Sequence, residues 1–326
     1  MEKIFLTGPT KSGKTCLLGS LIVAAGQSYI SNDPWQCAFR DLEVPTPPAR
    51  RDRAQGNDGD ELRIETGSLT DLHKMAAGVV RDGPRIEATR ILREYRFKVE
   101  VSGREQPEMK PRRLGWPKKK RRWMADVAVL DAPGGFAWGA DGSETDHRRL
   151  MFERASRCQG MIFCVDANNS EACSDFFLQM PEFISKVSAE GMPFSRIAVV
   201  LTRADQVHNH AGAGNRRQLE SDIPWGRVRQ LLSRNSLSAL LQAADNGNAQ
   251  LACGWASAYG FVPYEGTANF DPETQALLTC NPNVPINQLY DSWEPFRVLE
   301  PFVFLLSGEP GNMVLYDHTI RAQFAT

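Results

Sequence analysis

The sequence predicts an α/β protein with a doubly wound, mainly parallel sheet of six strands and helices on both faces. Short apolar segments alternate along the chain with longer segments whose apolar residues recur at helical spacing. Several of the short segments are almost continuously apolar, which is typical of parallel strands covered by helices on both sides. The six expected strands are 3–7, 94–101, 125–131, 160–166, 196–202 and 250–255.

The first expected strand leads into a glycine-rich loop and then a helix. The loop, GPTKSGKT at 8–15, fits the pattern GxxxxGK[ST], and a plain glycine turn is the alternative. In such a loop backbone N–H groups converge on a phosphate, and the lysine reaches the β- and γ-phosphates of a nucleotide. The hydroxyl of the final serine or threonine ligates Mg²⁺. The positive end of the helix dipole adds to the attraction. The expected phosphate-binding residues are Gly8, Pro9, Thr10, Lys11, Ser12, Gly13, Lys14, Thr15 and Cys16, with Thr15 also a metal ligand.

The second expected strand, 94–101, alternates charged and apolar residues, as an edge strand does. The third, 125–131, is almost continuously apolar and ends in the tetrapeptide DAPG at 131–134. A carboxylate at Asp131 can hold Mg²⁺ through a water, and the Gly134 N–H is placed to contact a terminal phosphate. Without the phosphate loop, an ordinary turn residue would be the better interpretation of Asp131.

The last two motifs point to a purine. TRAD at 202–205 follows the fifth strand, and the Asp205 carboxylate can accept from both N1–H and the 2-amino group of guanine, a donor pair that adenine lacks. Arg203 can lie against the purine face. ASA at 256–258 follows the sixth strand, where the Ala258 N–H can reach the guanine O6 and Ser257 can brace the loop. A solvated turn is the alternative for Asp205.

With these four motifs the chain resembles the Ras-like GTPases of the translation-factor-related P-loop class. Residues 8–15, 131–134, 202–205 and 256–258 match the first, third, fourth and fifth motifs of that family. The resemblance implies a G-domain that binds GTP or GDP with Mg²⁺, hydrolyses GTP and acts as a molecular switch, with Thr202 among the nucleotide-binding residues and Lys14 and Gly134 in catalysis. The long insertions and the TRAD variant look more like bacterial double-GTPase proteins of conflict systems, which implies regulation of a protein assembly.

The family's second motif is a threonine that grips Mg²⁺ and the γ-phosphate just before the second strand. Thr89 lies nearest to that place and is expected to be both metal ligand and catalytic residue, with Thr66 and Thr70 as competitors. After the third motif the family commonly has a glutamine that orients water, and this chain has Gly135. Hydrolysis would then need a group from elsewhere, such as an arginine finger from a partner, which contributes ~10³–10⁵ in rate.

Length and motif order predict one enlarged domain over 1–308 and a C-terminal tail over 309–326, which has no obvious place in the sheet. The net charge of −1 argues against a general attraction to nucleic acid. A cytoplasmic protein is expected, because the chain has no signal peptide pattern and no apolar run long enough to span a bilayer. The seven cysteines show no metal-ligand spacing. Four insertions are expected, at 26–88, 104–123, 206–248 and 261–292. The first is expected to be a mobile loop. The third is expected to contain a helix that begins at Ser221 or Asp222, ahead of Pro224.

One insertion carries a strong local charge. KPRRLGWPKKKRRW at 110–123 has eight basic residues and no acidic one, and it joins the second and third strands. A solvated loop, an acidic protein partner, and RNA, DNA or anionic lipid are the alternatives. For the chain as a whole, the leading hypothesis is a GTP-hydrolysing switch with an effector or activating protein. A GTP-binding scaffold with weak turnover and an ATP-using P-loop enzyme compete with it, and the oligomeric state is left open.

Overall fold

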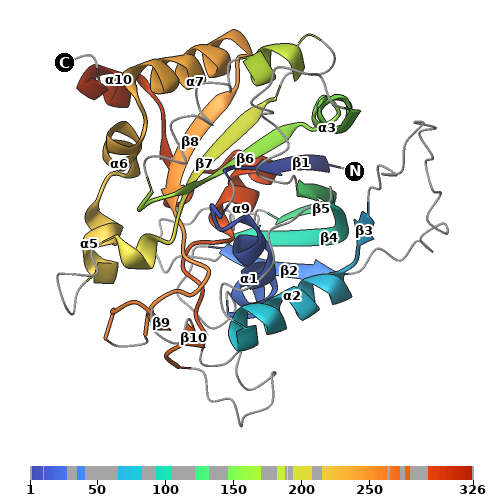
Figure 1. Cartoon of the computed structure of the whole chain (residues 1–326), viewed down its shortest axis with the longest axis vertical. Coiled ribbons are helices and arrows are strands. Elements are labelled where there is room, and N and C mark those ends of the chain that lie inside the picture. Colours follow the sequence, from blue (N-terminus) through green and yellow to red (C-terminus); the bar gives the residue numbers. More distant parts are fainter. Residues whose placement is uncertain are drawn as a thin grey trace, which may run out of the picture.

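The structure, a computed structural model, describes residues 2–9, 11–27, 35–40, 65–82, 93–103, 122–131, 146–169, 182–187, 189, 194–207, 215–262, 265–271, 276–279 and 293–324. Its elements alternate between strands and helices along much of the chain (Figure 1). In order they are β1 (Glu2–Thr7), α1 (Lys14–Gln27), β2 (Trp35–Arg40), β3 (Glu65–Gly67), α2 (Leu69–Asp82), β4 (Arg93–Gly103), β5 (Arg122–Asp131), α3 (Asp146–Ala155), β6 (Gly160–Asp166), β7 (Arg196–Thr202), the 3₁₀ helix η3 (Ala204–Gln206), α5 (Asn215–Ser221), α6 (Pro224–Leu231), α7 (Arg234–Asn246), β8 (Gln250–Trp255), β9 (Phe270–Asp271), β10 (Ala276–Leu277), α9 (Glu300–Ser307), β11 (Val314–Leu315) and α10 (His318–Phe324).

The main sheet contains all six expected strands, but it is larger and more mixed than predicted. Nine strands take part, in the order β11-β8-β7-β6-β1-β5-β4-β2, with β3 also paired to β4. The inner pairs β5–β1, β1–β6, β6–β7 and β7–β8 are parallel. Strand β4 runs antiparallel to β5 and to β2, and β11 runs antiparallel to β8. The prediction of a mainly parallel six-stranded sheet is therefore wrong in its count and in its margins.

The expectation that 94–101 forms an edge strand is also wrong. Strand β4 lies between β5 and β2, and its first residues pair with β3 as well. Its alternating pattern has a different cause, because Tyr95, Phe97, Val99 and Val101 are buried while the residues between them are partly exposed. The alternation of apolar and charged residues shows that one face of the sheet is buried at β4 and the other is partly exposed, which is possible for an inner antiparallel strand as well as for an edge strand.

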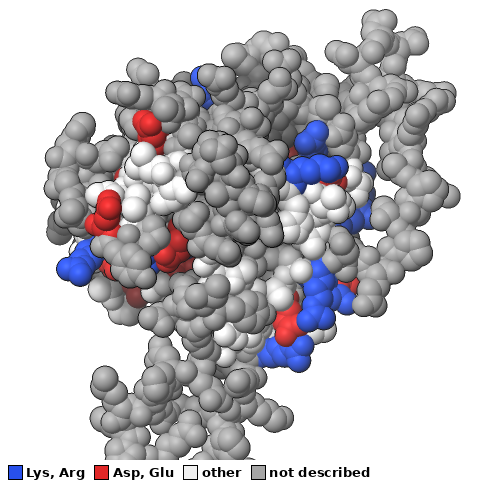
Figure 2. Space-filling model, turned by 90° about the horizontal axis from the view of Figure 1, so that it is seen from below, with Lys and Arg blue, Asp and Glu red and all other residues white. Residues whose placement is uncertain are grey.

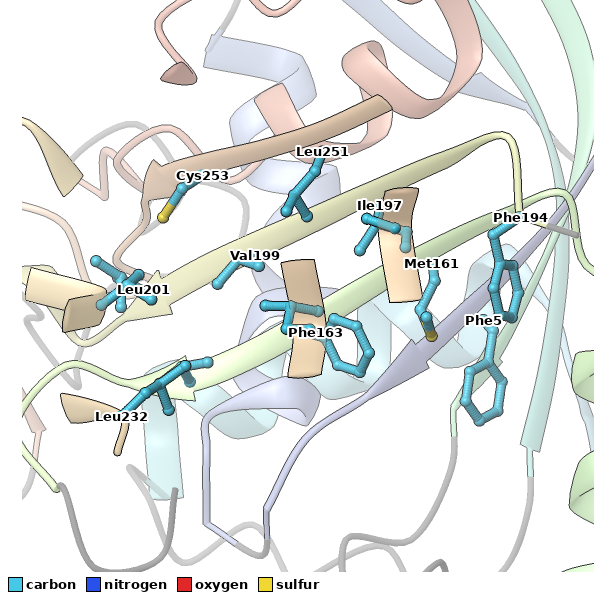
Figure 3. Close-up of a cluster of buried hydrophobic side chains, with 14 of the residues drawn as sticks. Phe5, Met161, Phe163, Phe194, Ile197, Val199, Leu201, Leu232, Leu251 and Cys253 are labelled. Carbon is cyan, nitrogen blue, oxygen red and sulfur yellow. The ribbon is translucent and has the colours of Figure 1, made fainter. Parts of the chain in front are cut away.

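Helices cover both faces of the sheet, as predicted. Along β7 the side chains of Ile197, Val199 and Leu201 belong to one buried cluster, and those of Ala198 and Val200 belong to the other. The first cluster includes residues of α3, 182–187, α5, α6, α7 and α10, and part of it is drawn in Figure 3. The second includes residues of α1, α2 and α9. Full burial of each large aliphatic side chain stabilises the fold by about 1.5–3 kcal/mol, so this two-sided core fixes the strand ends that carry the motifs.

Two helices replace the single helix expected after Pro224. Helix α6 ends at Leu231 and α7 begins at Arg234. The Ser233 Oγ accepts a hydrogen bond from the Ser236 N–H at 3.1 Å, so Ser233 caps the second helix and marks the break. The N-cap of α6 is Ile223, which makes no side-chain cap bond, so the prediction that Ser221 or Asp222 caps it is wrong. Pro224 at the first position tolerates this because it has no N–H to satisfy.

The segment 26–88, expected to be a loop, contributes β2, β3 and α2 to the fold. Helix α2 starts with a reciprocal cap, in which Ser68 N–H donates to Asp71 Oδ2 at 2.8 Å and the Asp71 N–H donates to Ser68 Oγ at 3.3 Å. It packs closely on α1, since a Cβ on Gly19 would lie 3.3 Å from the Ala76 backbone nitrogen. The two helices lie side by side in Figure 1.

The residues after Gly308, for which we expected no place in the sheet, also form elements. Strand β11 pairs with β8 through Val314 and Leu315, and α10 follows it. The Trp225 indole N–H donates to the Val314 carbonyl at 2.8 Å, which ties α6 to this strand. In the segment 261–292, β9 and β10 form a small antiparallel pair. The domain boundary at 308 stays a prediction.

The described surface carries both charge signs close together. In Figure 2 basic and acidic side chains lie side by side on the face shown, in keeping with a net charge of −1. Most of the basic segment 110–123 lies outside the described residues, which resume at Arg122. At its end Arg122 pairs with Glu100 at 2.7 Å, and the Trp123 ring packs edge-on against Trp35 with centroids 5.4 Å apart.

Two further expectations concern the membrane and the cysteines. No helix in the described part of the chain combines the length and the apolarity that a membrane span needs. Within the same residues no group of three or more His, Cys, Asp and Glu side chains forms a metal cluster. Cys37, Cys158, Cys164 and Cys253 are buried, as small core residues are. Burial raises the pKa of the Cys158 and Cys164 thiols to about 12.

Candidate functional site

Three of the four sequence motifs lie at the carboxyl ends of parallel strands of the same sheet, and the fourth begins at the end of β5, the strand next to β1. The phosphate loop follows β1, TRAD follows β7 and ASA follows β8. The Ala204 N–H donates to the Ala256 carbonyl at 3.2 Å, which joins the last two motifs. In α/β sheets ligands bind at this edge, so the fold places the motifs where a ligand site is expected.

The phosphate loop has the backbone geometry that its glycines allow. Gly8, Lys11 and Gly13 have φ angles of 151°, 64° and 81°, and a Cβ on Gly8 would lie 2.3 Å from the Cys164 carbonyl oxygen. Only glycine therefore fits at position 8. The Leu17 N–H donates to the Gly13 carbonyl at 2.9 Å, so α1 begins as the loop ends and its amino-terminal end, the positive end of its dipole, adjoins the loop.

Lys14 crosses this loop from the first turn of α1. Its Nζ donates to the Gly8 carbonyl at 2.8 Å and to the Pro9 carbonyl at 2.9 Å, and the residue is 6% exposed. Burial lowers its pKa, while the Asp131 carboxylate opposes that change. The ammonium is therefore held by two carbonyl oxygens of the loop, at the place where a phosphate-binding lysine is expected.

Asp131 ends β5 beside the phosphate loop, because β1 and β5 pair in parallel with Leu6 opposite Asp131. It is 1% exposed. Thr15 is partly buried in the first turn of α1. A hydroxyl and a carboxylate are oxygen ligands of the kind that Mg²⁺ prefers, and Mg²⁺ usually keeps several waters, so two protein ligands and a phosphate fit such a site.

Thr202 connects the phosphate loop to the sheet. Its Oγ1 lies 2.7 Å from the Ser12 carbonyl oxygen and 3.0 Å from the Val165 carbonyl oxygen. A Cβ on Gly13 would also lie 3.4 Å from the Thr202 hydroxyl. The strand that carries TRAD therefore fixes the position of the phosphate loop.

Asp205 lies in η3 and is fully buried. The Ser257 hydroxyl donates to its Oδ1 at 2.5 Å, and the same hydroxyl oxygen accepts from the Gly260 N–H at 2.8 Å. Within the described residues, the second carboxylate oxygen, Oδ2, is buried and has no hydrogen-bond partner. Burial raises the pKa of Asp205 to about 6, and the bond from Ser257 opposes the shift. A buried oxygen without a partner is costly, which indicates an acceptor reserved for a ligand.

The ASA loop brings further side chains to this place. The Trp293 indole N–H donates to the Ala258 carbonyl at 2.7 Å, and Ser257 pairs with Phe296 through two backbone bonds of 3.0 and 2.9 Å. Tyr259 is buried and lies close enough to Cys16 for their side chains to interact. Sequence reasoning missed Tyr259 and Trp293, for which no motif exists.

Sequence reasoning also missed two residues at the end of β6. The Arg203 guanidinium bonds to Asp166 Oδ2 at 3.0 Å, and Asn168 Nδ2 donates to the Arg203 carbonyl at 3.2 Å. Asp166 ends an apolar strand as Asp131 does, and that shared pattern is the signal that could have found it.

Three predicted site residues cannot be placed. Thr10, Thr89 and Gly134 lie outside the described residues, as does Gly135. The described members of the predicted set are brought together, and they come from the phosphate loop, the end of β5, TRAD and ASA. Their roles in binding and catalysis stay predictions.

Neither a known protein family nor a curated protein matches the chain. Solved structures similar to it include the signal recognition particle receptor SRb-GTP/SRX complex from Chaetomium thermophilum, with 12% identity over 80% of this chain and 95% of that chain and a TM-score of 0.34. The bacterial selenocysteine-specific elongation factor EF-Sec has 12% identity and a TM-score of 0.27, and the match covers 79% of this chain but only 26% of EF-Sec. The small COPII coat GTPase SAR1 from Encephalitozoon cuniculi in complex with GDP has 11% identity over 79% of this chain and 69% of that chain, with a TM-score of 0.26. Likenesses at this level do not identify the ligand, so the ligand has to be inferred from the chain's own contacts.

Proposed function

We propose that this chain is a guanine-nucleotide-binding switch that hydrolyses Mg²⁺·GTP slowly unless a partner assists. The observation that carries the proposal is Asp205. Its carboxylate is buried, held by Ser257, and keeps one oxygen without a partner in the described part of the chain. Guanine offers two adjacent donors, N1–H and the 2-amino group, which together satisfy two carboxylate oxygens. Adenine offers no such pair, so it would leave the buried oxygen unsatisfied at a cost of about 1–3 kcal/mol.

The phosphate loop supports the same proposal from the other end of the ligand. Lys14, the loop with its two glycines and the start of α1 form an anion site, and Thr202 links that site to the end of β7, three residues before Asp205. A nucleotide spans the two places, with its phosphates at the loop and its base at Asp205.

The burial of Asp205 has a kinetic consequence. Because this residue is 0% exposed, a base reaches it only after a neighbouring side chain moves aside. Tyr259 is the candidate, since it is buried and close enough to Asp205 and Arg203 for their charges to act on it. We therefore expect slow association, with a rate that increases in Tyr259→Ala.

Competition between nucleotides tests the choice of base. A fluorescent GDP analogue bound to the purified chain should be displaced by GTP and GDP at far lower concentration than by ATP. Asp205→Asn should weaken the binding of GTP and strengthen the binding of xanthosine triphosphate. Xanthine has a carbonyl at C2 to which the asparagine amide can donate. Equal displacement by ATP and GTP would favour an ATP-using P-loop enzyme instead.

Turnover needs a separate test. We place Mg²⁺ on Thr15 and Asp131, with Thr89 as a third ligand and Gly134 as the contact to the γ-phosphate, in line with the family resemblance. Because Gly135 stands where a water-orienting glutamine is common, single-turnover hydrolysis of GTP by the purified chain should be slow and should accelerate with cell extract. If GTP binds tightly but is not hydrolysed in either condition, the alternative of a GTP-binding scaffold would be favoured. On the resemblance alone, the proposal extends to regulation of a bacterial protein assembly or conflict system.

A further inference from the structure

We propose that Asp166 is a positioning residue for nucleotide binding, which holds the Arg203 guanidinium edge-on so that its flat face meets the purine. This inference rests on the proposed function. It concerns a residue outside the four motifs, at the carboxyl end of β6.

The position of Arg203 is defined on both its backbone and its side chain. Its backbone has φ 55° and ψ 35°, in the left-handed region that non-glycine residues rarely adopt. The Asn168 side chain donates to its carbonyl at 3.2 Å, and its Nη1 lies 3.0 Å from Asp166 Oδ2. A strained backbone persists only where its surroundings fix it, and here the end of β6 supplies the contacts.

Asp166 is itself fixed by its surroundings. The residue is 7% exposed, and its Oδ1 accepts from the Asn168 N–H at 2.9 Å. The parallel pairing of β6 and β7 sets Asp166 opposite Thr202, the residue before Arg203. Each carboxylate oxygen therefore has its own partner, and the ion pair is a built contact rather than a chance surface pair.

The geometry of a guanidinium explains why this pair favours base binding. Its N–H groups lie in one plane, so a carboxylate bonds at the edge and leaves both flat faces open to stack on an aromatic ring. A lysine ammonium has no such faces. Arg203 is one residue from the end of β7 and two residues before Asp205, and its side chain is about one third exposed (36%). The guanidinium is close enough to Cys16 in the first turn of α1 and to Asp205 for its charge to act on both, so it lies near the phosphate loop and near the base-reading carboxylate.

A double-mutant cycle tests the inference. The probe is GDP with a ribose-linked fluorophore, and the measured quantity is its Kd. Asp166→Asn keeps an oxygen that can accept from the Asn168 N–H and removes the charge that pairs with Arg203. It should weaken binding about tenfold, the size of a stacking contact of 1–2 kcal/mol. Arg203→Gln should weaken binding by at least as much.

The combined variant decides the matter. If Asp166 acts through Arg203, the Kd of the double variant should lie within about twofold of that of Arg203→Gln alone, because both substitutions remove the same contact. If the two fold-increases in Kd multiply in the double variant, the inference is overturned. Arg203→Lys supplies an independent arm, since it keeps the charge without the plane and should also bind about tenfold more weakly. Unchanged Kd in that variant would overturn the argument from planarity.

Two controls distinguish a lost stacking contact from a general loss of charge or of folding. Glu153→Gln breaks an Arg–carboxylate pair of 2.7 Å on the exposed side of α3, away from the site, and should leave the Kd within about twofold. Thermal unfolding without nucleotide shows whether each variant folds. If the wild-type chain binds neither GDP nor GTP, the proposed function fails. If it binds and Asp166→Asn binds equally well, only the role of Asp166 fails.

Discussion

The raised pKa of Asp205 makes a quantitative prediction about stability and pH. Its folded pKa is about 6, against 3.8 for an unperturbed aspartate, and the cause is burial. The folded state therefore binds a proton more readily than the unfolded state at that group. Stability should increase as the pH falls through 6, since protonation relieves the cost of a buried charge. This sign is opposite to that of a salt-bridged carboxylate.

The magnitude follows from the difference in pKa. About two pKa units correspond to roughly 3 kcal/mol once both states are protonated, and about 1 kcal/mol of this develops between pH 7 and pH 5. Other carboxylates also titrate in this range, so the useful quantity is the difference between wild type and Asp205→Asn. The asparagine does not ionise. Urea unfolding of the nucleotide-free chain at pH 7, 6 and 5 measures this difference. As the pH falls, the free energy of unfolding of wild type should increase by about 1 kcal/mol relative to that of the variant.

Nucleotide binding should depend on pH in the opposite direction. In the proposed function the ionised carboxylate of Asp205 accepts from both guanine donors, so below pH 6 the affinity for GDP should fall by up to about tenfold per pH unit. The stability of the nucleotide-free chain and its affinity for GDP would thus change in opposite directions over the same interval. Parallel stability curves for wild type and Asp205→Asn between pH 7 and 5 would refute the reasoning, because they would show that Asp205 does not titrate there.

Three more predictions follow from single contacts. Gly8→Ala should abolish nucleotide binding and lower the free energy of unfolding in urea by about 3 kcal/mol, because its Cβ would meet a carbonyl oxygen at 2.3 Å. Gly26→Ala is the control: a Cβ there has no atom within 4 Å, so its free energy of unfolding should stay within about 1 kcal/mol of wild type. Trp225→Phe should cost about 1–3 kcal/mol by the same assay, since it leaves a β11 carbonyl without its indole donor; an unchanged midpoint would contradict that role. Cys164 should react with a thiol reagent at pH 8 only after denaturant is added, because its thiol is buried and its pKa is raised; labelling of the native chain at this residue would contradict that burial.

Much of the site follows from sequence because its parts are local. The phosphate loop needs glycine at fixed positions, and the chain has Gly8 and Gly13 there, with the φ angles that such a loop requires. The sequence predicts that Ser257 braces its loop, but it does not predict the hydrogen bond from Ser257 to Asp205. That the Asp205 Oδ2 has no partner among the described residues follows from the packing of whole elements, which no motif records.

The margins of the sheet were missed for a different reason. Strands β3 and β11 have three and two residues, which is too short for a period of two to show in the sequence. Their places are set by what they pair with, β4 and β8. The break between α6 and α7 was missed because Leu231 and Leu232 continue the apolar stripe through it, and only the cap at Ser233 marks the end.

Asp166 shows the same limit at the site itself. It lies 37 residues before Arg203 in the chain, and the two meet because β6 and β7 pair in one particular register. A shift of the register by one residue would move Asp166 to the other face of the sheet. The contact is therefore a property of the fold, although each residue alone looks like an ordinary strand end.

The backbone bonds between Ser257 and Phe296 set the order in which the chain can become functional during synthesis. The first part of the site emerges from the ribosome with residue 8, but the loop that holds Asp205 is closed only by a segment almost 300 residues later. Domains fold as units during synthesis, so a nascent chain that ends before that segment would hold a phosphate loop without a finished base pocket. Nucleotide loading would then be a late event, one that reports completion of the fold.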